Sequence, residues 1–169
     1  MPKLEPDFQD RRFFVRLFGD DVYAVGGFVR DILRRKPSGE IDLLVTRRTL
    51  DEIIGILEPK GKVDLVGKSF GVIKFTRAGR TVDIALPRID RAAVKSVRGH
   101  KDIRAQSDPM LPVEEDLRRR DFRCNSLAWR LSDGALIDPF NGRRDIREKI
   151  LRLTDPAAFP EDPLRVLRA

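Results

Sequence analysis

The stretch YAVGGFVRDILRRKPSGEIDLLV, from Tyr23 to Val45, decides the fold. In it a short apolar run ends at Gly26-Gly27, and an acid-apolar-acid triplet follows at Glu40-Ile41-Asp42. Because residues i and i+2 of a strand share one face, Glu40 and Asp42 are predicted to stand side by side. Neighbouring carboxylates repel each other, and a divalent cation that prefers oxygen ligands, such as Mg²⁺, relieves the repulsion. The alternative is that both acids are ordinary outward-facing strand residues.

The two glycines favour the first interpretation. Gly26 and Gly27 lie between a predicted strand and a predicted helix, where backbone N–H groups can approach an anion at the positive end of the helix dipole. Arg30, one turn into that helix, can reach the same anion. A Gly-Gly pair alone is also consistent with a tight turn. A third acid, Asp83, lies within the apolar run TVDIAL. If its strand pairs beside the first, three carboxylates converge on one sheet edge, which predicts phosphate chemistry at a metal.

The hydrophobic pattern predicts mixed strands and helices in the first half of the chain. Helices are expected over residues 8–18, 28–35 and 49–57, with Thr49 as N-cap, and strands over 21–27, 40–46, 62–67, 71–77 and 81–88. From Ile89 to Pro112 the chain is polar and predicts a mobile loop. Residues 113–131 then predict a broken helix, 134–140 a short strand, 141–150 a helix and 160–169 the start of another.

These elements indicate an α/β (α+β) fold, in which helices flank a small mixed sheet that leads into a helical segment. We therefore expect two units, a head over residues 1–115 and a helical neck that begins at 116–169. The net charge of +7 suggests an anionic partner, nucleotide or nucleic acid, although a solvated basic surface is the alternative. One cysteine and one histidine exclude a disulfide framework and a His-rich zinc site. The sequence shows neither a signal peptide nor a membrane span, so a cytoplasmic protein is expected.

Four segments resemble one known family. The Gly-Gly turn with its acidic triplet resembles the nucleotidyltransferase superfamily of DNA polymerase beta. More narrowly, GGFVRDILRRKPSGEIDLLV, DLRRRDFRCNSLAW, GALIDPFNGRRDI and FPEDPLRVLRA occur in the order found in class II (bacterial-type) CCA-adding tRNA nucleotidyltransferases and the related bacterial poly(A) polymerases. The resemblance covers residues 23 to 169. It implies a nucleotidyltransferase head and the start of a neck.

The resemblance also implies roles for individual residues. Glu40 and Asp42 would bind Mg²⁺, with Mn²⁺ as an alternative, and Asp83 would be the third catalytic acid. The nucleotide would be bound by Gly26, Gly27, Arg30, Arg119, Arg120, Asp121, Asn125, Asp162, Arg165 and Arg168. For the last three an alternative remains: Asp162 as a helix cap, and Arg165 and Arg168 as a solvated helix face.

The implied activity is addition of CMP or AMP from CTP or ATP to an RNA 3′ end, as in tRNA CCA addition, with release of pyrophosphate by a two-metal mechanism. Polyadenylation by the same family is one rival, and a non-catalytic nucleotide- or RNA-binding head fragment is another. The chain departs from the family pattern at Glu40, where Asp is usual, and at Arg123 and Cys124, where Thr and Ile are usual. It also ends before the base-reading neck motif, so a truncated head is expected. No membrane partner is expected, and the oligomeric state is left open.

Overall fold

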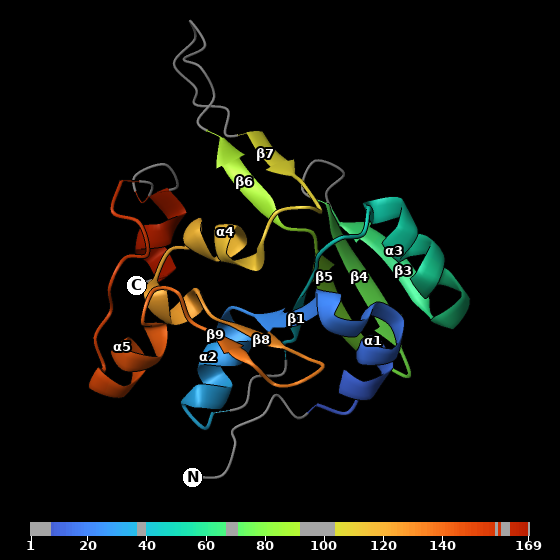
Figure 1. The fold of residues 1–169 in the computed structure, drawn as a ribbon, viewed down its shortest axis with the longest axis horizontal. Coiled ribbons are helices and arrows are strands. Elements are labelled where there is room, and N and C mark those ends of the chain that lie inside the picture. The colour runs from blue at the N-terminus through green and yellow to red at the C-terminus, as the bar shows by residue number, and fades with distance from the viewer. Residues whose placement is uncertain are drawn as a thin grey trace, which may run out of the picture.

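The computed structural model describes residues 8–36, 40–66, 71–91, 104–157, 159 and 163–168. Its centre is a seven-stranded sheet in the order β3-β4-β5-β2-β1-β8-β9 (Figure 1). Strands β2 and β5 run parallel, and every other neighbouring pair in this sheet is antiparallel. The strands span Val22–Val25 (β1), Asp42–Val45 (β2), Lys62–Val66 (β3), Val72–Arg77 (β4), Arg80–Ala85 (β5), Ala128–Arg130 (β8) and Leu136–Ile137 (β9). The predicted mixed sheet is confirmed.

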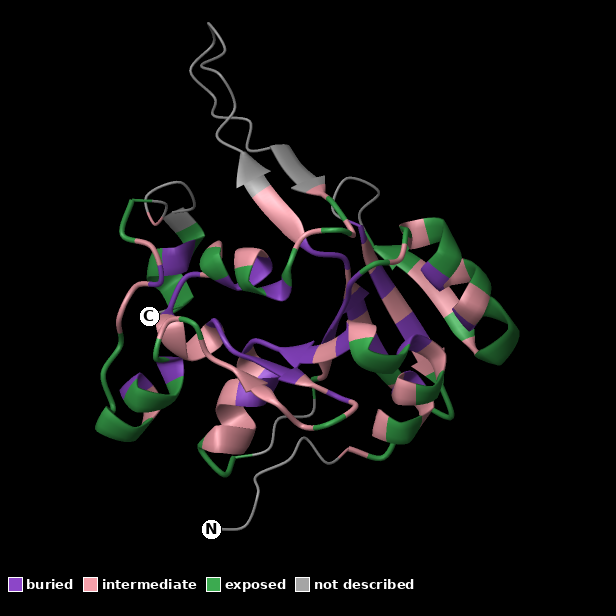
Figure 2. Ribbon diagram, viewed as in Figure 1, coloured by how far each residue is buried: buried purple, intermediate pink, exposed green. Residues whose placement is uncertain are grey.

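Helices α1 (Arg11–Phe18), α2 (Gly27–Leu33) and α3 (Leu50–Leu57) cover one face of the sheet. Their apolar residues pack on every second residue of the strands, and the buried residues run through the sheet in Figure 2. The predicted N-cap of α3 is confirmed, because Thr49 and Glu52 form a capping box. The main core contains Phe14, Phe18, Val22, Ala24, Phe28, Val29, Leu43, Val45, Ile53, Leu57, Ile73, Phe75, Val82 and Ile84.

The alternate residues of the same strands point to the opposite face, as the two-residue period of a strand requires. There Val25 and Leu44 form a smaller core with Val113 and Leu117 of α4 (Val113–Arg118). Asp42 lies two residues before Leu44 and therefore shares this face. The two-residue period of the strands thus gives the sheet one apolar face, covered by three helices, and a second face on which Asp42 lies.

The prediction of one mobile loop from Ile89 to Pro112 is wrong at both ends. Strands β6 (Arg88–Arg91) and β7 (Arg104–Ser107) pair antiparallel as a separate two-stranded sheet, which projects beyond the main sheet in Figure 1. The central part of the predicted loop lies outside the described residues. Each strand has a single apolar residue among charged and polar ones, so no apolar alternation indicates a strand there, and backbone pairing joins the two.

The broken helix predicted over residues 113–131 is also corrected. Helix α4 ends at Arg118, a 3₁₀ turn spans Arg123–Asn125, and β8 pairs with β1, where Trp129 lies opposite Ala24. Residues 126–129 are buried on both faces, and a continuous apolar run does not distinguish a buried strand from a helix. Strands β8 and β9, which follow residue 116, belong to the same sheet as β1, so this sheet contains strands from both of the units expected from the sequence.

The remaining elements agree better with the prediction. Strand β9 and helix α5 (Gly142–Glu148) occupy the predicted positions, and residues Pro163–Arg168 form a 3₁₀ helix, η5, where the start of a helix was expected. In the part of the chain that the structure describes, no helix combines the length and apolar character needed to span a membrane.

Candidate active site

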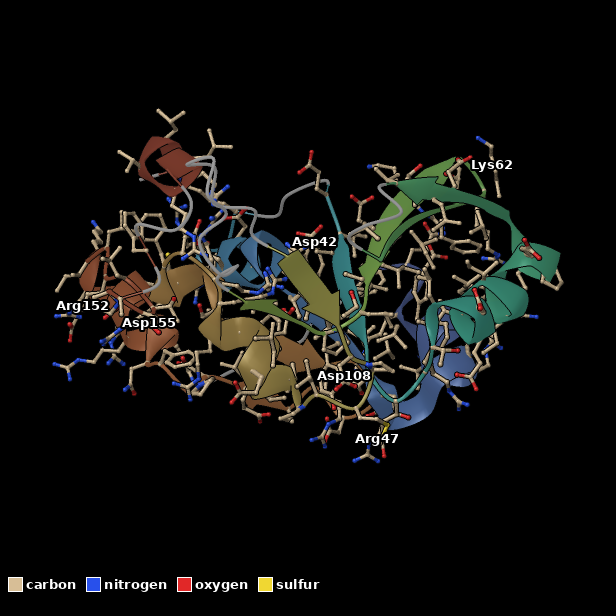
Figure 3. The ribbon with its side chains drawn as sticks, turned by 90° about the horizontal axis from the view of Figure 1, so that it is seen from above. Asp42, Arg47, Lys62, Asp108, Arg152 and Asp155 are labelled. Atoms are coloured by element: carbon tan, nitrogen blue, oxygen red, sulfur yellow. The ribbon has the colours of Figure 1, made fainter. Side chains whose placement is uncertain are left out.

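Asp42 and Asp83 form an acid pair at the centre of the candidate site. Asp42 begins β2, Asp83 lies in β5, and the parallel register places them directly opposite each other. The backbone N–H of Asp83 donates to the carbonyl of Ile41 at 3.1 Å, which extends the pairing one residue beyond β2. Figure 3 shows Asp42 near the middle of the molecule, at the start of its strand. The structure therefore brings together two of the three predicted acids.

Glu40 lies just before β2 and is exposed. It stands close enough to Asp42 for its charge to raise the pKa of that carboxyl. Among the described residues, however, no three His, Cys, Asp or Glu side chains are grouped so that they could hold a metal ion. Of the three carboxylates predicted to converge, Asp42 and Asp83 form a pair, and Glu40 lies beside them at the exposed start of the strand.

The pKa of Asp42 reflects the charges around it. Burial raises this pKa above the ordinary value of 3.8, and the charges of Asp83 and Glu40 raise it further, while Arg120 and Lys74 act in the opposite direction. Two cations therefore reach the acid pair. Carboxylate oxygens held together against their own repulsion are the donor set that Mg²⁺ and Mn²⁺ prefer, so the chemistry of the site fits such an ion.

Arg120 lies against Gly26 and beside Asp42. A Cβ atom at Gly26 would stand 2.6 Å from Nη1 of Arg120 and 3.8 Å from Oδ2 of Asp42. Gly26 also has φ +69 and ψ −136, a conformation that side chains rarely adopt. The sequence predicts that this glycine lets an anion approach the backbone. The structure adds that the missing side chain gives Arg120 the space to reach the acid pair.

Asp116, which was not among the residues predicted from the sequence, holds Arg119 and Arg120. Its side chain is fully buried, with Oδ1 accepting from Nε of Arg119 at 2.9 Å and Oδ2 accepting from Nη2 of Arg120 at 3.0 Å. Burial alone would raise the pKa of Asp116, but the charges and hydrogen bonds of Arg120 and Arg119 outweigh it and lower the pKa. The i,i+3 and i,i+4 spacing of an acid and two arginines was the available signal.

A second network links α2 to η5. Arg30 donates from Nε and Nη2 to Asp31 at 2.8 and 3.1 Å, and from Nη1 to Oδ1 of Asn125 at 2.7 Å. Asn125 donates to Asp121 at 2.9 Å, and Arg168 donates from Nε to the other oxygen of Asp121 at 2.9 Å. The structure therefore brings four of the predicted nucleotide-binding residues into one hydrogen-bonded chain.

The last predicted residues lie at the end of this network. Arg165 is buried and donates from Nη2 to the backbone carbonyl of Arg119 at 2.9 Å, which joins η5 to the arginine motif. Its burial does not agree with the alternative of a solvated helix face, whereas Arg168 is half-exposed. Asp162 lies outside the described residues. Burial raises the pKa of Asp121, but its bonds from Asn125, the Phe122 backbone and Arg168 lower it on balance.

Two hollows lie apart from these networks. One, of about 240 Å³, opens where β2 ends, between Tyr23, Thr46, Arg47 and the segment that leads into α4. The other, of about 400 Å³, lies over α1, with Phe13 and Leu17 surrounded by Arg16, Lys60 and Arg77. Neither is lined by a predicted site residue. The candidate site is therefore identified by its side chains and their contacts.

Comparison with known proteins identifies relatives of this chain. Residues 22–152 match the family described as the poly(A) polymerase head domain. The multifunctional CCA protein of Stenotrophomonas maltophilia (strain R551-3) is 42% identical over 148 residues, which are 88% of this chain and 34% of that protein. The multifunctional CCA protein of Aromatoleum aromaticum is 42% identical over 147 residues, 87% of this chain and 33% of that protein.

Solved structures of CCA-adding enzymes share the fold of this chain. The Bacillus stearothermophilus CCA-adding enzyme in complex with CTP matches with a TM-score of 0.73 and 31% identity, over 91% of this chain and 35% of that one. A CCA-adding enzyme in its apo form II matches with a TM-score of 0.74 and 31% identity, over 96% and 39%. The chain spans about a third of the length of the curated relatives it matches.

Proposed function

The chain belongs to the family of poly(A) polymerase head domains, and from this premise we propose that it is the catalytic head of an RNA nucleotidyltransferase. It would add CMP or AMP from CTP or ATP to the 3′ end of a tRNA. The observation that carries the proposal is the register of Asp42 opposite Asp83, beside Gly26 and Arg120. The relatives named as CCA proteins, and the CCA-adding enzyme in complex with CTP, support the choice of tRNA and nucleotide.

In this proposal Glu40, Asp42 and Asp83 are the catalytic residues. Glu40 and Asp42 would hold a divalent ion, Mg²⁺ or Mn²⁺, and their oxygen donors suit it. When bound, such an ion lowers the pKa of a hydroxyl and stabilises developing negative charge on phosphate oxygens. Asp83 would accept the proton of the RNA 3′-hydroxyl. The 3′-oxygen then forms a bond to the α-phosphorus, the bond between that phosphorus and the bridging oxygen breaks, and pyrophosphate leaves.

The basic residues would bind and orient the nucleotide. Arg119 and Arg120, fixed by buried Asp116, would contact the triphosphate, with the backbone of Gly26 and Gly27 beside it. Arg30 would contact the same phosphates. The nucleotide would also be bound by Asp121, Asn125, Asp162, Arg165 and Arg168, and the hydrogen bonds that join Asp121 to Asn125 and Arg168 support a joint role for these three. A guanidinium with fixed partners loses little entropy on binding phosphate, which favours this arrangement over mobile surface charges.

Polyadenylation is the second candidate function, because the matching family is itself described as a poly(A) polymerase head domain. A head that binds nucleotide without transferring it is the candidate of another class. A cytoplasmic location is part of the proposal for either enzyme.

The test is incorporation of labelled ATP and CTP, supplied separately, onto a tRNA that lacks its 3′ end. The 169-residue chain is assayed with Mg²⁺ and with a chelator, beside Asp42→Ala. Metal-dependent transfer that disappears in Asp42→Ala is the expected result, and the preferred nucleotide and product length separate CCA addition from polyadenylation. Nucleotide binding without transfer would support the non-catalytic alternative for this chain. Absence of both binding and transfer would overturn the proposal.

A further inference from the structure

Lys74 belongs to a line of charges that crosses the candidate site. Asp64, Lys74, Asp83 and Asp42 are direct register neighbours on the successive strands β3, β4, β5 and β2. Nζ of Lys74 donates to both carboxylate oxygens of Asp83, at 3.0 and 3.2 Å. The acid that faces Asp42 therefore already has a cation of the protein on both of its oxygens.

The contact between Lys74 and Asp83 is partly open to solvent. The side chains are 44% and 38% exposed. Ion pairs with this exposure contribute little to stability, so the pair is easily exchanged for another cation. A divalent ion carries twice the charge of an ammonium group and competes for the same oxygens. A metal ion that binds the oxygens of Asp83 therefore competes with Lys74 for them.

The neighbouring strand offers Lys74 a second acceptor. Asp64 lies directly opposite Lys74 on the side away from Asp83. Asp64 is half-exposed and accepts from Lys62, two residues before it on the same strand, at 2.7 Å. Lys74 thus stands between two carboxylates, one that belongs to the acid pair and one that does not, and a rotation of its flexible stem exchanges one for the other.

We propose that Lys74 is a displaceable internal counter-cation of the acid pair: it occupies Asp83 until a divalent cation binds, and it competes with that cation. Lys74 is then a positioning residue that holds Asp83 in place across from Asp42 and sets how tightly the site binds a metal ion. This role rests on the proposed function and extends it, because it takes Asp83, the proposed proton acceptor, as a further oxygen ligand of the ion that Glu40 and Asp42 would hold.

The test measures Mn²⁺ binding to the 169-residue chain without nucleotide or RNA, from the electron paramagnetic resonance signal of free Mn²⁺. Binding that Asp42→Ala removes defines the acid-pair site. Lys74→Met is expected to bind Mn²⁺ about three- to five-fold more tightly at that site, the scale of an exposed ion pair. Lys62→Met is the matched control, because it removes the same charge from the same sheet face but from a lysine that pairs with Asp64. It is expected to change the affinity less than Lys74→Met does, because Lys74 remains in the protein and only its second acceptor, Asp64, becomes free.

The outcomes separate this inference from the proposed function. Wild-type binding with equal or weaker affinity in Lys74→Met would overturn the role of Lys74 and leave the proposed function standing. Equal tightening in Lys62→Met would also overturn it, because general surface charge would then explain the effect. If the wild type shows no Mn²⁺ binding that depends on Asp42, both the metal site and the role of Lys74 fall. Circular dichroism of each variant confirms that the fold is intact.

Discussion

Asp42 and Asp83 face each other across β2 and β5, the parallel pair of the main sheet. Like charges directly opposite in a sheet are destabilising, and burial adds to the cost because it raises the pKa of Asp42. Arg120 and Lys74 offset only part of this cost. An arrangement that opposes stability at the centre of a sheet is typical of a functional site, and it gives the acid pair a signature that is measurable without substrate.

Replacing Asp42 with Asn is therefore expected to stabilise the metal-free protein while it abolishes transfer. At pH 7 the free energy of unfolding should rise by a few tenths to about 1 kcal/mol. Because the pKa of Asp42 is raised, the folded protein binds the proton more tightly than the unfolded chain. The wild type therefore loses stability as pH rises from 3.8 through the folded pKa, and its difference from Asp42→Asn should shrink towards pH 4. Urea unfolding in a chelator at both pH values measures this, and a less stable variant at pH 7 would contradict it.

Gly26→Ala is expected to damage the site, whereas Gly27→Ala is not. At Gly26 a methyl group would stand 2.6 Å from Arg120 at a positive φ, whereas at Gly27 the nearest atom, Nη2 of Arg30, is 3.5 Å away. The first change should cost about 2–3 kcal/mol of stability and weaken ATP binding, and the second should stay within about 0.5 kcal/mol. Thermal unfolding and ATP titration of both variants test this. Equal effects would show that the space above Gly26 does not matter.

Asp116→Asn should destabilise the protein by roughly 3 kcal/mol, because it leaves Arg119 and Arg120 partly buried without their carboxylate. Burial raises the pKa of Asp116, but the two arginines lower it on balance. The ionised Asp116 therefore stabilises the folded protein above pH 3.8, and this stabilisation is lost as pH falls through the folded pKa. The variant should therefore show a shallower dependence of unfolding free energy on pH below about 4. Glu115→Gln is the control, since the contact of Glu115 with Arg118, at 3.7 Å, lies between two exposed side chains. If the unfolding free energy of Asp116→Asn depends on pH below about 4 as steeply as that of the wild type, this assignment is contradicted.

The sequence predicted the first half of the sheet well, because alternation along β4 and β5 is regular and the Gly-Gly turn marks the start of α2. It failed for β8, where burial on both faces removes the alternation, and for β6 and β7, whose residues show no apolar period. The sequence predicts that Asp83 lies near Asp42 only if the strands that carry them pair, and it does not predict that pairing. Strand order is a property of the whole chain, and local patterns do not encode it.

The contacts of the site were less predictable than its residues. Local spacing suggests that Arg119 and Arg120 can share Asp116, but it does not show that Asp116 is fully buried. The contact between Lys74 and Asp83 depends on the register of β4 and β5, and that between Arg30 and Asn125 joins residues far apart in the chain. Such contacts arise from tertiary packing, so a single sequence can suggest the residues but not which of them contact each other.

Arg30→Lys tests whether the link between α2 and the arginine motif is needed. Arg30 uses three nitrogens to hold Asp31 and Asn125 at once, and an ammonium group cannot reproduce that planar fork. The change should cost about 1–2 kcal/mol of stability and weaken ATP binding several-fold, because Asn125 and Asp121 lose their fixed partner.

Arg34→Lys is the matched control for that substitution. Arg34 lies one turn further along the same segment and approaches Asp31 only at 3.8 Å, with its side chain 47% exposed, so the lysine should be tolerated within about 0.5 kcal/mol. Chemical unfolding and ATP titration of both variants provide the comparison. If Arg30→Lys binds ATP as the wild type does, the bond between Arg30 and Asn125 serves the fold alone, and Arg30 must be removed from the residues proposed to contact the triphosphate.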